Sequence, residues 1–345
     1  MYGARTSHPD VQLTYLIGSD LDDYSAPADG PLVPLGRALT DAGLHAAKIG
    51  KWHLSSPQDL LHPLEHGWTN YAGVMGNLRT GQGESFENFT LNVDGPATVM
   101  TGTYLTTLET DLGIYAMHAG YDLVSDSYHA IHRPFHVPPA ELYSGPVPTT
   151  DVERARAMLE ALGRELMRLA CTADQLGYQL ILFSDNGGVG ALGGAKGSLL
   201  EAGIRTRAWV YGPGVQPGVD DSLVGAYDIY ATVLEFFGLA TGPNFGPDSV
   251  SFLPTWGGQP GTRQYLFQER YEKNGEDPAQ APREWLRAIV GPASKLVMNL
   301  DQPSLFRLLG PELLMEALVP PTQFTPADEE ERDTLLHWLE EWTGQ

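Results

Sequence analysis

Residues 178–188 read YQLILFSDNGG. A nearly continuous apolar run of this kind is typical of a strand buried on both faces, as in a parallel sheet that helices cover. The run ends in an acid, an amide and two glycines, and ligands of open α/β sheets usually bind beyond the carboxyl ends of the strands. The stretch therefore predicts an α/β fold with a mostly parallel central sheet and a candidate site that includes Asp185 and Asn186.

The neighbouring segments alternate between helical and extended patterns. Before the strand, leucines and a methionine recur on one face of a predicted helix of about 20 residues that begins at Asp151, with Asp151 as its N-cap. Further helices are predicted over residues 34–46, 103–119 and 227–239, and further strands over residues 46–49, 121–127 and 208–211. Residues 60–101 are rich in Gly, Asn and Thr and are expected to form loops and short strands.

After about residue 260 the pattern changes to short strands separated by turns. The strands are predicted over residues 264–268, 286–290 and 295–299, and a terminal helix is predicted over residues 328–342. We therefore expect two domains, an α/β domain over residues 1–260 and a small α+β subdomain over residues 261–345.

Composition excludes several classes of function. The chain has 345 residues, of which 42% are hydrophobic, and a formal charge of -22 that would repel nucleic acids and anionic membrane surfaces. It contains no apolar run of about 18 residues that could span a membrane, and its opening residues do not resemble a signal peptide. The single cysteine, Cys171, cannot form an intramolecular disulfide.

A cation and an imidazole follow a short predicted strand in the segment KIGKWHLS. Lys51 and His53 are two residues apart, so their side chains point the same way in an extended segment, with Trp52 between them. Together they could bind one anionic group. The alternative is that both are ordinary surface residues.

Three histidines, His129, His132 and His136, lie in the proline-containing loop SYHAIHRPFHVP. Prolines restrict the loop, which could then aim imidazoles at a substrate. An exposed polar loop and a three-histidine metal site are alternatives that the spacing leaves open.

Asp185 and Asn186 would suit a hard cation such as Ca²⁺ or Mg²⁺, although Asp185 could instead cap the following turn. Farther along, the segment AKGSLLEAGIR contains Lys196, Glu201 and Arg205, which would be unremarkable as a charged helix start.

Taken together, the order of these motifs along the chain is more specific than any one of them alone. From about residue 35 to residue 318 the chain resembles the sulfatase family of the alkaline phosphatase superfamily. The resemblance rests on six motifs in the family's order and at similar spacing, and on a C-terminal segment, LFRLLGPELLMEAL: the six are GKWHL, SYHAIHRP, FSDNGG, KGSLLEAGIR, AYDIYATVLEFFG and GPDSVSFLP.

The resemblance implies hydrolysis of sulfate esters. In sulfatases a cysteine in C-x-P-S-R is oxidised to formylglycine, whose hydrate attacks sulfur, while Ca²⁺ or Mg²⁺ and cationic side chains stabilise the sulfate oxygens. At the matching positions, Lys51 and His53 would contact the formylglycine and the sulfate oxygens. His132 would bind sulfate or protonate the leaving oxygen, and Lys196 would hold another sulfate oxygen.

The resemblance also implies that Asp185 and Asn186 are metal ligands. Tyr128 and His129 match the family more loosely and receive no role. Substrates would be sulfated small molecules or glycans, with no nucleic acid and no membrane span.

One part of the family pattern is missing from these residues. Paired aspartates and C-x-P-S-R should precede GKWHL, but only 50 residues precede Lys51 and the opening MYGARTSHPDVQ resembles the family's segment after the cysteine motif. Cys171 lies in CTADQ, which lacks the arginine, and the acidic residues Asp20, Asp22 and Asp23 read as a solvated loop. We therefore expect a sulfatase fold that is incomplete at its N-terminus, without formylglycine and with weakened metal affinity.

Three hypotheses follow. The chain is a sulfatase by descent that is inactive as given, a catalytically dead protein that binds an anion or glycan, or one subunit of a split sulfatase whose second chain supplies the missing segment. The sequence leaves the localisation unknown.

Overall fold

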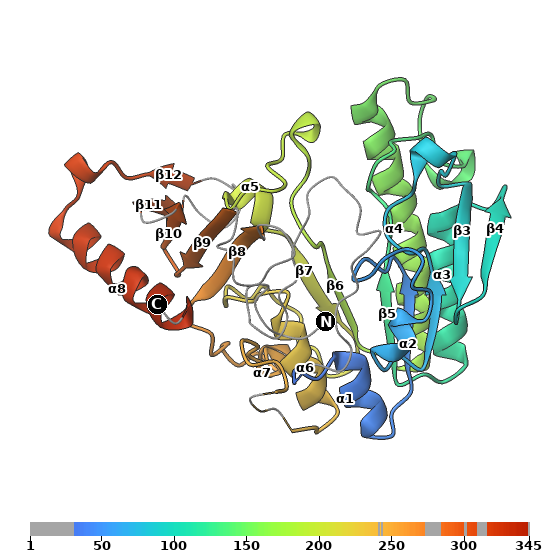
Figure 1. Ribbon diagram of the computed structural model, residues 1–345, viewed down its shortest axis with the longest axis horizontal. Coiled ribbons are helices and arrows are strands. Elements are labelled where there is room, and N and C mark those ends of the chain that lie inside the picture. Colours follow the sequence, from blue (N-terminus) through green and yellow to red (C-terminus); the bar gives the residue numbers. More distant parts are fainter. Residues whose placement is uncertain are drawn as a thin grey trace. The chain divides into compact units, whose positions relative to one another are not determined.

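A computed structural model of the chain describes residues 31–240, 242, 244–272, 284–299, 302–308 and 316–343 (Figure 1). The opening MYGARTSHPDVQ, the acidic residues 20–23 and residues 309–315 of the C-terminal motif lie outside the described residues.

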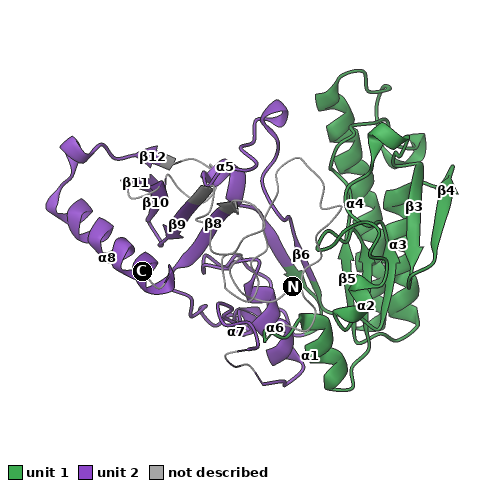
Figure 2. Ribbon diagram, viewed as in Figure 1, with its two compact units in different colours: residues 1–2, 18–180, 210–213 green, residues 3–17, 181–209, 214–345 purple. Residues whose placement is uncertain are grey.

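The chain divides into two compact units (Figure 2). The described part of the first unit consists of residues 31–180 and 210–213, and that of the second consists of residues 181–209 and the described residues from 214 onward. The expected domain boundary at residue 260 stays a prediction.

The first unit is built on a five-stranded sheet with the order β4-β3-β2-β1-β5. Its centre is β1 (Ala46–Gly50), which pairs in parallel with β2 (Asn70–Gly73) and β5 (Leu123–Ser127). The hairpin of β3 (Asn88–Val93) and β4 (Ala97–Thr101) extends the sheet in antiparallel fashion. The sheet is therefore mixed, with its parallel part at β2-β1-β5.

Two long helices cover this sheet. The apolar residues of β1 pack with Ala116 of α3 (Leu105–His118), and α3 in turn packs against Leu169 and Ala173 of α4 (Asp151–Leu176). The N-cap of α4 is Thr150 rather than the predicted Asp151, because the Thr150 hydroxyl and the Glu153 carboxylate form a reciprocal capping box. Short helices α1 (Leu35–Asp41) and α2 (His62–Glu65) complete the unit.

The strand predicted from the apolar run before Asp185 is present as β6 (Leu180–Phe183), which pairs with β7 (Ala208–Tyr211). Its four residues are half-buried, not buried as the apolar run predicted. The second unit continues with helices α5 (Glu201–Ile204), α6 (Asp228–Phe236) and α7 (Leu253–Trp256). The predicted helix of residues 227–239 is therefore confirmed as α6.

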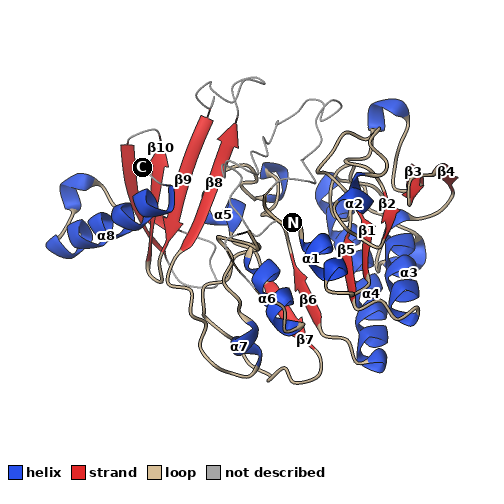
Figure 3. Cartoon of the chain, turned by 60° about the horizontal axis from the view of Figure 1, so that its bottom comes forward, coloured by secondary structure: helices blue, strands red, loops and turns tan. Residues whose placement is uncertain are grey.

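The C-terminal part forms a second five-stranded sheet, which is antiparallel and has the order β12-β11-β10-β9-β8. Figure 3 shows β8, β9 and β10 of this sheet side by side. Leu335 and Leu339 of the terminal helix α8 pack on the apolar face of this sheet, together with Ile289 and Leu296. The bounds are Leu266–Glu272, Glu284–Val290, Ser294–Asn299, Gln302–Leu308 and Glu316–Leu318 for β8 to β12, and Pro326–Thr343 for α8. Among the described helices, none has the length and apolar character needed to cross a bilayer.

Candidate functional site

The carboxyl ends of three parallel strands meet at one edge of the first unit's sheet. Gly50 at the end of β1 lies opposite Ser127 at the end of β5. Beyond the strands, the Lys51 amide donates to the Ser127 carbonyl at 2.8 Å, and the Trp52 amide donates to the Val74 carbonyl at 3.1 Å. The loops that follow β1, β2 and β5 are therefore held side by side, and we call this edge the β1/β2/β5 edge.

Lys51 contributes a cation to this edge. Its side chain is half-buried, and its Nζ donates to Oδ1 of Asn77 at 2.6 Å. Asn77 follows β2 and is exposed. The contact with the amide oxygen fixes the direction of the ammonium group at this edge.

Trp52 is the buried residue of the KWH segment, between the half-buried Lys51 and His53. Its ring is 3% exposed, and its Nε1 donates to Nδ1 of His62 at 3.1 Å. His53 lies on the other side of the backbone, where a Cβ on Gly76 would be only 3.6 Å from its Cδ2. The predicted separation of Lys51 and His53 from Trp52 agrees with this burial pattern.

The three histidines after β5 have different surroundings. His129 is 3% exposed and is paired through Nδ1 with Oε1 of Glu109 from α3 at 2.6 Å. His136 stacks on Phe86, with ring centroids 4.3 Å apart, and burial lowers its pKa. His132 is half-buried, and its Nδ1 lies 3.0 Å from the Arg133 carbonyl. Because their partners differ, the described geometry does not favour a shared three-histidine metal site, and no such metal cluster occurs among the described residues.

A buried lysine lies beneath the edge. Lys48 of β1 places its Nζ 2.6 Å from Ser127 Oγ and 3.1 Å from the Ile49 carbonyl. Burial lowers the pKa of Lys48 to about 8, while the nearby carboxylates of Asp126 and Glu109 oppose this shift. Burial, followed by repulsion from Glu109, raises the pKa of Asp126 well above its usual range.

The second unit contains the other predicted site residues in one tightly folded loop. Asp185 is exposed, and the Asn186 side-chain amide donates to the Gly187 carbonyl at 3.0 Å. The Lys196 amide donates to the Gly188 carbonyl at 3.0 Å, so the predicted lysine adjoins the loop that carries the acid and the amide. A Cβ on Gly187 would lie 2.0 Å from the Ala202 carbonyl oxygen, so this packing requires glycine.

The described residues do not by themselves fit the calcium or magnesium ion that the sequence resemblance implies. Such ions take six or more oxygen ligands, and the predicted ligands are Asp185 and Asn186 alone. Across the described ranges, no group of three or more His, Cys, Asp or Glu residues could hold a metal ion. We therefore derive no chemistry through a metal.

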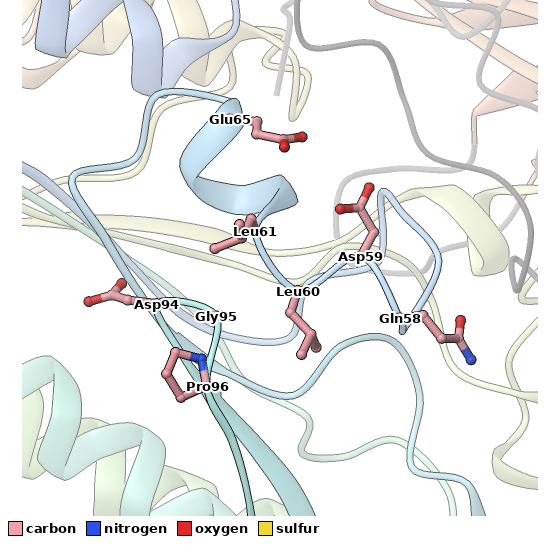
Figure 4. A pocket seen from close by; sticks show the side chains of 8 residues that line it. All are labelled: Gln58, Asp59, Leu60, Leu61, Glu65, Asp94, Gly95 and Pro96. Atoms are coloured by element: carbon pink, nitrogen blue, oxygen red, sulfur yellow. The ribbon is translucent and has the colours of Figure 1, made fainter.

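A pocket of about 520 Å³ lies elsewhere in the first unit (Figure 4). Acidic residues from the α2 region and from the β3–β4 turn line it, among them Asp59, Glu65 and Asp94. The Asp94 carboxylate binds Asn70 and the Tyr71 amide at the start of β2, not at its carboxyl end. An acidic wall would repel sulfate, so this cavity is not the candidate anion site.

Sequence reasoning missed Asn77 and Glu109. Asn77 lies in the loop after β2 and reaches Lys51 only through folding, and Glu109 is an internal residue of α3 that is 1% exposed. The signal that could have found Glu109 is an acidic residue among apolar neighbours on the inward face of a helix.

No protein-family model matches the sequence. Three solved structures of similar fold are Ps i-CgsB with k-i-k-neocarrahexaose, BT4656 with its substrate D-glucosamine-2-N,6-O-disulfate, and the phosphonate monoester hydrolase SpPMH from Silicibacter pomeroyi. Their TM-scores are 0.72, 0.69 and 0.65, with sequence identities of 18%, 17% and 16%. The alignments cover 93%, 99% and 97% of this chain and 75%, 85% and 83% of those chains. The chain thus has the sulfatase-like fold of the alkaline phosphatase superfamily.

Proposed function

We propose that this chain binds the sulfate group of a sulfated sugar at the β1/β2/β5 edge, as a protein of the sulfatase type. The observation that carries the proposal is that the segment of Lys51 and His53 and the loop of His132 follow parallel strands that end at one edge of the sheet. In α/β sheets this is where ligands bind.

The side chains suit a sulfate ester chemically. The Lys51 ammonium would pair with a sulfate oxygen by a charge-assisted hydrogen bond. His53 and His132 would donate further hydrogen bonds, and a protonated His132 could pass its proton to the leaving oxygen if the ester bond breaks. The sequence resemblance implies a sulfate-binding role for Lys196 of the second unit as well, and Asp185 and Asn186 are its neighbours in the loop.

Hydrolysis needs a nucleophile in addition to this binding. The 345 residues contain no C-x-P-S-R, and Cys171 is exposed on α4. For these residues we therefore propose sulfate binding without turnover. A chain that hydrolyses, with a nucleophile on another polypeptide, is the alternative.

A sugar substrate is supported by the fold comparison. BT4656 takes D-glucosamine-2-N,6-O-disulfate as its substrate, and Ps i-CgsB binds a carrageenan-type oligosaccharide. SpPMH acts on phosphonate monoesters, so phosphonates belong in the test as competitors.

Calorimetric titration tests the proposal. Inorganic sulfate and D-glucosamine-2-N,6-O-disulfate should bind saturably, D-glucosamine should not, and Lys51→Ala should weaken binding by about tenfold, as expected for loss of one charged hydrogen bond. Arg154→Ala, which removes an exposed cation of α4, is the matched control. Equal affinity in both variants would contradict the assignment. Release of sulfate from an aryl sulfate, dependent on Lys196, would favour the hydrolytic alternative.

A further inference from the structure

His129 has a hydrogen-bond acceptor at each ring nitrogen. Its Nδ1 lies 2.6 Å from Oε1 of Glu109, and its Nε2 lies 3.2 Å from the carbonyl oxygen of Gly76. Both residues of the ion pair are buried, with 3% of His129 and 1% of Glu109 exposed. Neither a carboxylate nor a carbonyl oxygen can donate a hydrogen bond.

A neutral imidazole has one N–H and one lone pair. Opposite an ionised Glu109, a neutral His129 would point a lone pair at an oxygen lone pair in a buried setting, where repulsion and the lost hydrogen bond are costly. With both nitrogens protonated, each contact becomes a donated hydrogen bond and Glu109 supplies the counter-charge.

We infer that His129 is a buried imidazolium, paired with Glu109, which holds the loop of Gly76 and Asn77 and thereby positions Lys51 at the β1/β2/β5 edge. The positioning half of this inference rests on the proposed function, whereas the charge of His129 does not.

The contacts form a continuous path. The Glu109 carboxylate also accepts from the His129 backbone amide, which fixes the start of the loop after β5. Nε2 of the imidazole contacts the Gly76 carbonyl oxygen, and the Gly76 amide in turn donates to the Trp52 carbonyl at 2.5 Å. The next residue, Asn77, accepts from Lys51 Nζ at 2.6 Å. One buried pair therefore connects the loops that follow all three strands.

The His132 backbone belongs to the same arrangement, because its amide donates to the His129 carbonyl at 2.7 Å. The imidazolium is thus a positioning residue for Lys51 and for the loop of His132, and it need not contact a ligand itself.

Other charged groups lie around the pair. From β1 comes the Lys48 ammonium, from β5 comes Asp126, and both interact electrostatically with Glu109. The His53 ring lies near Gly76, since a Cβ built on Gly76 would be 3.6 Å from His53 Cδ2. Glu109 is the carboxylate in direct contact with the imidazole, so its removal is the change that should discharge the ring.

Nitrogen-15 NMR of the histidine side chains tests the charge directly. In the full chain, both ring nitrogens of His129, assigned by the peaks lost in His129→Gln, should carry protons at neutral pH, because each faces an acceptor. A spectrum with one protonated nitrogen at neutral pH would overturn the inference. This measurement uses no ligand. It would therefore still decide the charge of His129 if the chain failed to bind sulfate.

Substitutions test the positioning. Glu109→Gln should leave His129 with one ring proton at neutral pH and weaken sulfate binding by about tenfold. Asp111→Asn, which removes an exposed carboxylate from the same helix, should change neither. Discharge of His129 with unchanged sulfate affinity would overturn the positioning role while preserving the proposed function.

A separate variant covers the case in which Glu109→Gln does not fold. Asn77→Ala alters an exposed side chain. It removes the hydrogen bond that Asn77 accepts from Lys51 and should weaken sulfate binding, with the His129 spectrum unchanged. The contrary result would be that Lys51→Ala abolishes sulfate binding whereas Asn77→Ala leaves the sulfate affinity unchanged. It would show that the path through Asn77 does not position the lysine.

Discussion

Lys51 and Asn77 follow different strands of one sheet, and Lys51 Nζ donates to Asn77 Oδ1 at 2.6 Å. The contact orients the ammonium group. Replacing the amide by a carboxylate in Asn77→Asp would add a negative charge where sulfate is proposed to bind. We expect this variant to bind sulfate more weakly than Asn77→Ala, by at least several-fold at low ionic strength and by less in high salt. Calorimetric titration at two salt concentrations measures the difference. Tighter binding in Asn77→Asp would contradict an anion site at Lys51.

A second prediction concerns acid stability. Burial, followed by repulsion from His62, lowers the pKa of His66 to about 3. Between its unfolded pKa of about 6.5 and that value, the unfolded chain binds a proton that the folded chain excludes, so stability falls as the pH falls. The loss is at most about 1.4 kcal/mol for each pH unit.

Urea unfolding at several pH values measures this effect. Trp52, whose ring centroid lies 5.6 Å from that of His66, provides a local fluorescence signal. His66→Gln lowers stability near neutral pH but should flatten the decline below about pH 6.5. A variant whose stability declines as steeply as that of the parent chain would rule out His66 as the cause.

A buried ion pair leads to the third prediction. Lys295 is fully buried, and its Nζ lies 3.2 Å from Oε1 of Glu201, with a further hydrogen bond of 2.8 Å to the Leu199 carbonyl. Lys295→Met leaves the buried carboxylate without this counter-charge and should lower the free energy of unfolding by about 3–5 kcal/mol.

The double variant Lys295→Met with Glu201→Leu is the control, because it removes both charges. It should recover most of the loss. Equal stabilities of the single and double variants would show that the charge of Glu201 is not the source of the cost.

The fourth prediction tests the loop of Asp185 and Asn186. A Cβ on Gly187 would meet the Ala202 carbonyl oxygen at 2.0 Å, whereas one on Gly190 would meet nothing within 4 Å. Gly187→Ala should therefore lower the melting temperature and disturb sulfate binding that depends on Lys196, at a cost of about 1–3 kcal/mol in stability. Gly190→Ala should be close to neutral. Similar behaviour of the two variants would contradict the tight packing of this loop.

Local patterns predicted the strands that carry the candidate site. The strand predicted over residues 46–49 is β1, and its all-buried AAKIG explains why the prediction succeeded. The hairpin of β3 and β4 was not separated from its surroundings, although Asp94-Gly95 at its turn is a recognised hairpin signal. Single aromatic residues and asparagines interrupt the alternation of apolar and polar residues that would mark the two strands.

The site was predictable only in part, for a physical reason. Lys51 and His53 could be predicted as site residues because they lie two residues apart directly after a strand, so that their side chains point the same way. The partners that hold the edge, Glu109 and Asn77, come from elements brought together by folding. His129 received no role from the sequence because its importance lies in two buried contacts that spacing cannot show. Asp151 was mistaken for a cap because a threonine immediately before it forms the capping box.

The central claim is that a sulfate-like anion binds beside Lys51. Crystals of the full chain soaked in selenate, which has the shape and charge of sulfate and an anomalous scatterer at its centre, would locate the anion directly. We predict an anomalous peak whose oxygen shell is in hydrogen-bonding contact with Lys51 Nζ, about 2.7–3.0 Å away, and which is lost in Lys51→Ala. A peak elsewhere in the chain, with none at Lys51, would contradict the account.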